Sequence, residues 1–234
     1  MRLEGSRIAA VAEILLCSSV PTQLLIGSLL GLAGWLPLDK AGQLSLPFVL
    51  TLSVADTLLL IGLMIVLTRL HGERVVDLWL GRRSPKAEAV YGALLIPVVF
   101  LLVVVLLNVL GAVAPWLHNV PINPLERMAG TPGQAAMFAV VAILAGGVRE
   151  ELQRAFLLRR FEQHLGGAGV GVVVLSVAFG LDHIVQGWDA VITTGLLGAF
   201  WAVLYLRRRS TVAPLVSHAG FNALEVLRVA IAGA

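Results

Sequence analysis

The chain has 234 residues, of which 58% are apolar and 13% are charged, and its mean hydropathy is +0.91. The charged share is about half the ~25% usual in soluble domains, so the composition excludes an ordinary soluble protein and indicates an integral membrane protein. The net charge of +3 comes from basic residues at the ends of apolar segments, which is a pattern of membrane topology and not of nucleic-acid binding. The single cysteine, Cys17, excludes an internal disulfide and a cysteine-based metal site.

Seven apolar segments are near or above the ~17 residues needed to cross a bilayer. Pro21 predicts a kink or a separate entry helix in the first segment, and the helix of the fourth should continue to Phe161. We therefore predict an all-α, polytopic transmembrane helical bundle of about seven membrane helices, in which residues 1–234 form a single membrane domain. The seven segments are residues 14–38, 44–68, 89–117, 128–148, 165–181, 190–206 and 211–231.

The connecting segments carry turn-forming residues. Residues 81–85 read Gly-Arg-Arg-Ser-Pro, and residues 119–124 read Asn-Val-Pro-Ile-Asn-Pro. The glycine-rich residues 166–169 predict a helix break. Residues 69–86 mix apolar and charged side chains, which predicts a short amphipathic helix along the membrane interface.

The distribution of lysine and arginine orients the predicted bundle. If the N-terminus lies in the cytoplasm, twelve basic residues fall on the cytoplasmic side and three fall on the other side. This bias follows the positive-inside rule, so we expect a protein of the cytoplasmic membrane of a prokaryote with a cytoplasmic N-terminus. The twelve are Arg2, Arg7, Arg69, Arg74, Arg82, Arg83, Lys86, Arg159, Arg160, Arg207, Arg208 and Arg209, and the three are Lys40, Arg127 and Arg228.

Three polar stretches lie inside or at the end of apolar segments. Residues 149–154 read Arg-Glu-Glu-Leu-Gln-Arg, residues 179–183 read Phe-Gly-Leu-Asp-His, and residues 218–222 read His-Ala-Gly-Phe-Asn. A charge in the hydrocarbon layer costs a few kcal/mol or more, so such residues are kept for pairing or for chemistry. The candidate site residues are Glu150, Glu151, Arg154, His183, His218 and Asn222.

Helical spacing indicates which of these side chains can meet. Glu150 and Arg154 are four residues apart and share a helix face, Glu151 is three residues from Arg154, and Arg149 should point elsewhere. Such a group can also be a buried ion-pair network that orients helices.

The histidine motifs use the same spacing. Phe179 and His183 share a face, as do His218 and Asn222. Each histidine alone can be a structural, hydrogen-bonded residue. A glutamate with two histidines can hold a metal or a nucleophilic water, and an asparagine can donate to the oxyanion of an attacked amide. The candidate metal ligands are His183, His218 and Glu150.

On these motifs, the chain resembles the CAAX protease and bacteriocin-processing (Abi) family of intramembrane peptidases. That family has Glu-Glu-x-x-x-Arg, then Phe-x-x-x-His, then His-x-x-x-Asn on successive membrane helices. The second and third patterns match at residues 179–183 and 218–222, whereas the first has two residues between the acidic pair and Arg154. One alignment places Arg149 where the family has its first glutamate; the other places Ala155 where it has arginine.

The resemblance implies a peptidase-like core over residues 128–231 with a polar cavity that opens toward the cytoplasm. It implies an intramembrane endopeptidase, with or without Zn²⁺, that cleaves near a lipidated or apolar segment by glutamate-activated water. The partners expected are the lipid bilayer and a hydrophobic or lipidated peptide, without nucleic acid. Two alternatives remain open at this point. One is a catalytically inactive relative that binds a partner or confers immunity, and the other is a proton-coupled transporter.

Overall fold

The computed structural model describes residues 6–232, and these residues form an all-α bundle in which no β-strand is present apart from one isolated bridge between Leu38 and Leu44. The predicted all-α membrane bundle is confirmed. The α-helices are α1 (Arg7–Leu16), α2 (Val20–Leu32), α3 (Leu46–Leu70), α4 (Val75–Trp79), α5 (Pro85–Val113), α6 (Pro132–Val141), α7 (Glu150–His164), α8 (Ala168–Leu181), α9 (Trp188–Arg208) and α10 (Val212–Ala232).

Within residues 6–232, five helical stretches are long and apolar enough to span a membrane: Arg7–Leu32, α3, α5, α9 and α10. The other two of the seven predicted segments are helical as well. The helix α8 has only 14 residues, and the fourth segment is a composite of α6, a π-helix and α7 that carries the acidic motif. The predicted start of this segment at Met128 is wrong, because Met128 lies in a 3₁₀ turn and Thr131 caps α6.

The first predicted span is broken in the middle. The helix α1 ends at Leu16, and α2 begins at Val20 after Ser19, which adopts a left-handed conformation with φ of 72°. Pro21 stands in the first turn of α2, where its missing N–H costs nothing, so the predicted kink is confirmed. The predicted interfacial helix over residues 69–86 is reduced to the five residues of α4.

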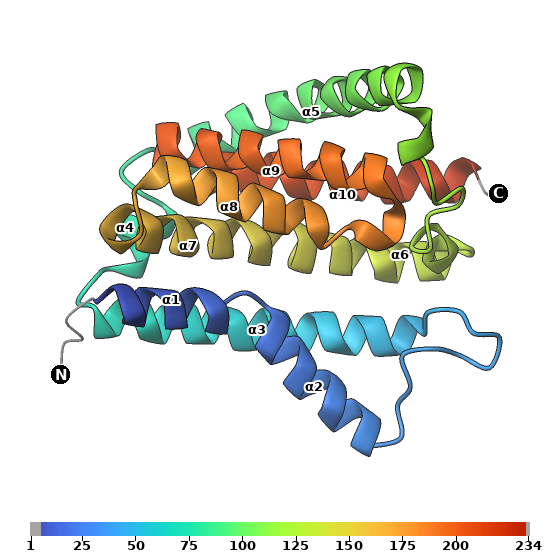
Figure 1. Ribbon diagram of the computed structural model, residues 1–234, viewed down its shortest axis with the longest axis horizontal. Helices are drawn as coiled ribbons and strands as arrows, with labels where there is room; N and C mark the ends of the chain where they lie inside the picture. The colour runs from blue at the N-terminus through green and yellow to red at the C-terminus, as the bar shows by residue number, and fades with distance from the viewer. Residues whose placement is uncertain (1–5, 233–234) are drawn as a thin grey trace.

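The helices lie roughly along one common direction (Figure 1). The helices α1 and α3 form one layer, and α2 diverges from it. Figure 1 shows α6 to α10 in the middle of the bundle, with α5 along the far side. The closest packing joins α8 to α9, and α10 to both α5 and the π-helix. The helices α8 and α9 approach closely at Gly180, since a Cβ there would lie 2.5 Å from the Val191 carbonyl oxygen of α9.

A π-helix over Ala142–Arg149 joins α6 to α7 and leads directly into the acidic motif. A π-helical turn holds more residues than an α-helical turn, so it shifts the phase of the side chains that follow. The π-helix packs on α10 through Gly147, where a Cβ would lie 2.5 Å from the Cβ of Ala219. The two backbones therefore approach closely next to His218.

The largest buried apolar cluster joins α3, α4, α7 and α9. Its centre contains Met64, Trp79, Phe156, Leu158 and Tyr205. The indole N–H of Trp79 donates to the carbonyl of Leu152 at 3.2 Å, which fastens α4 to α7. This cluster, called the basal core below, fills the end of the bundle where α4 lies.

Candidate active site

The acidic motif is held by charges from both sides. Arg149 ends the π-helix, and its guanidinium donates to Asp56 of α3 at 2.5 Å and to Glu150 at 3.2 Å. Arg149 was expected to point elsewhere than the face shared by Glu150 and Arg154; it binds Asp56, a fully buried carboxylate of another helix, and also reaches Glu150. Asp56 also accepts hydrogen bonds from Thr22 and from Gln23, the latter at 3.3 Å. This arrangement fastens α2 and α3 to the first residue of the motif.

Arg154 pairs with Glu151, which is three residues away. Spacing allowed Arg154 to pair with Glu150 or Glu151, and Glu150, which is four residues away, is not its partner. Glu151 is 1% exposed and also binds His218 of α10, with the His218 Nδ1 to Glu151 Oε1 distance 2.8 Å. Glu151, and not Glu150, is therefore the carboxylate that contacts both Arg154 and the Nδ1 of His218.

His218 is fixed in both orientation and tautomer. Its ring stacks on the indole of Trp201, with ring centroids 3.7 Å apart and an interplanar angle of 15°. The Trp201 indole N–H donates in turn to Ser217 at 2.9 Å. Because the Glu151 carboxylate accepts from Nδ1, the neutral His218 ring keeps its lone pair on Nε2. That Nε2 lies 3.9 Å from Glu150 Oε2, a separation at which a water can mediate the contact.

His183 stands just beyond the end of α8, at the start of a 3₁₀ turn. Its Nδ1 donates to the carbonyl of Phe179 at 2.8 Å, because a carbonyl oxygen can only accept. The Nε2 of the neutral ring is therefore the free acceptor, as in His218. The Phe179 ring lies edge-on to both imidazoles, with centroid distances of 5.0 Å to His183 and 6.0 Å to His218.

Asn222 lies one helical turn beyond His218 on α10, as its spacing predicted. Its side-chain amide donates to the carbonyl of Ala142 at 3.1 Å, at the first residue of the π-helix. A π-helix leaves carbonyls out of the α-helical hydrogen-bond pattern, and Asn222 satisfies one of them. The second N–H of the amide remains available to a ligand.

A cavity of about 720 Å³ adjoins these groups. His183, His218 and Asn222 all line it, so the structure brings the two histidine motifs to one chamber. Glu150, Glu151 and Arg154 are not among its lining residues and lie behind His218. The apolar part of the wall comes mainly from α5, α6 and α10, and includes Phe100, Val103, Leu107, Phe138 and Phe221.

A metal ion needs several donor side chains gathered around one point. Within residues 6–232, no three histidine, cysteine, aspartate or glutamate side chains gather closely enough to hold a metal ion. Zinc binding by His183, His218 and Glu150 stays a prediction. The two free Nε2 atoms are suitable acceptors for a water hydrogen.

Sequence reasoning missed three contributors to the site. They are Asp56, Trp201 and His118, none of which belongs to the three polar stretches. His118 lies on the cavity wall and contacts Asp189 at 2.7 Å. The one signal available in the sequence was Asp56, a lone charge inside an apolar span.

Residues 131–224 match the protein family described as type II CAAX prenyl endopeptidase Rce1-like. The match begins at the N-cap of α6 and ends within α10, so it contains all six predicted site residues. No curated protein and no solved structure matches the chain. The matched family confirms the resemblance stated from the three motifs.

Proposed function

We propose that the chain, whose residues 131–224 match the Rce1-like type II CAAX prenyl endopeptidase family, is an intramembrane endopeptidase that hydrolyses a peptide bond with a water activated by Glu150. The observation that carries this proposal is the gap of 3.9 Å between Glu150 Oε2 and His218 Nε2. Glu150 is the base because Glu151 is already occupied by Arg154 and His218. The side chain of Glu150 is 19% exposed, whereas that of Glu151 is 1% exposed.

The remaining residues position these two groups. Glu151 and Arg154 hold His218 by its Nδ1, and Trp201 holds the face of the ring. Arg149 binds Oε1 of Glu150, which leaves Oε2 for the water. General bases of this kind act through one hydrogen bond or one bridging water, and they contribute about 10²- to 10⁴-fold to the rate.

The reaction balances with the chain's own groups. Glu150 takes one proton from the water as the water oxygen bonds to the scissile carbonyl carbon. The free N–H of Asn222 donates to the oxyanion, and the Nε2 of His183 accepts from the water or from the substrate amide. Glu150 then gives its proton to the leaving nitrogen as the C–N bond breaks, which returns the carboxylate.

The cavity fits an apolar peptide. Its volume lies within the ~300–1,000 Å³ common for ligand sites, and its wall on α5 and α6 is hydrocarbon or aromatic. The hydroxyl of Thr193 lines the cavity and is buried without a hydrogen-bond partner among the described residues.

Cleavage of an apolar or prenylated peptide by the purified chain tests the proposal. Glu150→Gln and His218→Ala should each lower kcat by about 10²-fold or more, and His183→Ala should also slow turnover. Glu162→Gln is the matched control, because Glu162 pairs with Arg209 at the surface of the bundle. An inactive, partner-binding relative would show no cleavage in any variant, and equal turnover in all variants would end the assignment of Glu150.

A further inference from the structure

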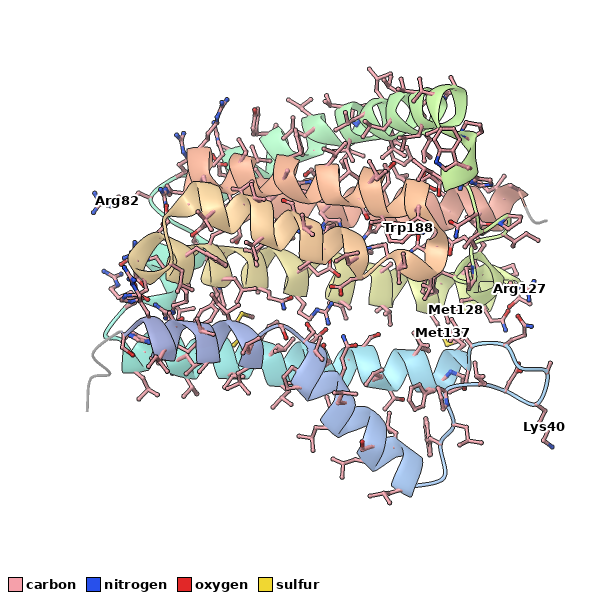
Figure 2. All side chains as sticks on the ribbon, in the orientation of Figure 1. Lys40, Arg82, Arg127, Met128, Met137 and Trp188 are labelled. Atoms are coloured by element: carbon pink, nitrogen blue, oxygen red, sulfur yellow. The ribbon has the colours of Figure 1, made fainter. Side chains whose placement is uncertain are left out.

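The guanidinium of Arg149 is shared between two carboxylates on different helices. Its Nη1 donates to Oδ2 of Asp56 at 2.5 Å, and its Nη2 donates to Oε1 of Glu150 at 3.2 Å. Asp56 belongs to α3, which packs on the π-helix that ends at Arg149. Figure 2 shows side chains in the space between the layer of α1 and α3 and the helices α6 and α7. Each carboxylate therefore receives one hydrogen bond from the arginine.

This divided arrangement differs from the one that an arginine commonly adopts with a single carboxylate. In that case the guanidinium donates two parallel hydrogen bonds, one to each carboxylate oxygen. Arg149 has a donor to spare for such a pair, because its Nε is buried and has no hydrogen-bond partner among residues 6–232. Once released from Asp56, the guanidinium can turn onto Glu150 and bind both of its oxygens.

Asp56 is held firmly enough to prevent this turn. Its carboxylate is fully buried, and it accepts from the Thr22 hydroxyl on Oδ1 and from the Gln23 amide on Oδ2, the latter at 3.3 Å. Leu60 and Met64, about one and two turns further along α3, are fully buried in the basal core. The carboxylate is thus fixed by α2 and by the packing of its own helix, so it holds the guanidinium on the side of α3.

We propose that Asp56 is a positioning residue of the active site, which keeps Arg149 from binding both oxygens of Glu150. Oε2 of Glu150 then stays free on the side of His218, whose Nε2 lies 3.9 Å away. A carboxylate with both oxygens bound to a guanidinium has no oxygen in position to take a proton from water. The role of Asp56 in catalysis rests on the proposed function, whereas its hold on Arg149 does not.

Two variants that break the same ion pair from opposite ends test this role. Asp56→Asn leaves Arg149 free to take both oxygens of Glu150, so kcat for an apolar peptide should fall about 10²-fold. Arg149→Gln removes the guanidinium and costs Glu150 one orienting hydrogen bond, so kcat should fall by at most about tenfold. Neither Asp56 nor Arg149 lines the cavity, so KM should stay within about twofold of the wild-type value in both variants.

The double variant Asp56→Asn with Arg149→Gln separates this role from a structural one. Its kcat should return to the level of Arg149→Gln, because no guanidinium remains to bind Glu150. Asp77→Asn is the control, since its pair with Arg74 is exposed, and it should keep the wild-type kcat. Equal losses of kcat in the two single variants, or a double variant as slow as Asp56→Asn, would overturn the role of Asp56.

All rates are compared at a temperature at which every variant is folded, as judged by its own thermal unfolding curve. Asp56→Ser, which leaves room for a water beside the guanidinium, replaces Asp56→Asn if that variant does not accumulate.

Thermal unfolding gives a second readout that needs no cleavage. With Asp56 present, Glu150→Gln still leaves Arg149 one carboxylate, so Tm should change little. In the Asp56→Asn background the same change removes the last carboxylate partner, and the decrease in Tm should be at least about twofold larger. Equal decreases in the two backgrounds would refute the transfer of the guanidinium to Glu150.

The two readouts separate this inference from the proposed function. A wild-type kcat in Glu150→Gln, or no cleavage by the wild type, refutes the proposed function. The comparison of Tm values then still decides whether Asp56 keeps Arg149 away from Glu150.

Discussion

Removal of the Asp56 carboxylate should destabilise the whole bundle. At 2.5 Å and an effective dielectric constant of about 20, its attraction to Arg149 amounts to about 7 kcal/mol. The desolvation of two buried ions offsets much of this gain, so the pair contributes little net stability. Asp56→Asn alone, however, leaves Arg149 buried with Glu150 as its one remaining carboxylate, and such a loss costs about 3–5 kcal/mol.

The assay is thermal unfolding of the purified chain in detergent, followed by tryptophan fluorescence. For a chain of this length, 1 kcal/mol corresponds to about 2–4 °C, so Asp56→Asn should lower Tm by about 6–20 °C. Asp77→Asn is the matched control, because its pair with Arg74 is exposed and should change stability by less than about 0.5 kcal/mol.

The double variant Asp56→Asn with Arg149→Gln completes the test. Removal of both charges should restore most of the lost stability, with a coupling energy of at least about 2 kcal/mol. Two results would refute the idea that an uncompensated buried arginine causes the loss of stability. One is additive losses in the double variant, and the other is a decrease in Tm of less than about 2 °C for Asp56→Asn.

Two further changes test the packing and the charges away from the site. Gly147→Ala should cost about 1–3 kcal/mol, since its Cβ would press on Ala219, whereas Gly133→Ala meets nothing within 4 Å and should be neutral; both are read from Tm. Burial alone would raise the pKa of Glu73, but the two arginines of α7 that contact it outweigh burial and hold its pKa below the ordinary value. This stabilisation is present above ~4.3 and lost as the pH falls toward the folded-state pKa. The free energy of unfolding measured from pH 7 to pH 3 should therefore fall more steeply for the wild type than for Glu73→Gln, and parallel curves would contradict this account.

Hydropathy predicted the helices well because each long apolar run must satisfy its own backbone hydrogen bonds in the membrane. The ends were less accurate: the capping residues Thr131 and Ser84 begin their helices, at Pro132 and Pro85, several residues away from the predicted starts. The break at Ser19 followed from Pro21. Apolarity alone cannot define a helix end, whereas a capping side chain followed by proline does.

Within the site, spacing limited the partners but did not choose among them. Arg154 can reach either glutamate on its own helix, and His218, 67 residues away from Glu151, decides the outcome. The partner of Asp56 lies 93 residues away on another helix and leaves no local signal in the sequence. The stacking of Trp201 on His218 is likewise a property of the folded packing of α9 on α10.

The wide turns between Ala142 and Arg149 also bear on how related chains should be aligned. A stretch of helix that can hold one residue more or fewer per turn absorbs a length change without unfolding its flanks. A chain with the longer Glu-Glu-x-x-x-Arg spacing can therefore bring a carboxylate to the same imidazole from an ordinary α-helix. Counting residues would then misplace the equivalent side chain by one position, and superposition of the imidazoles is the safer guide.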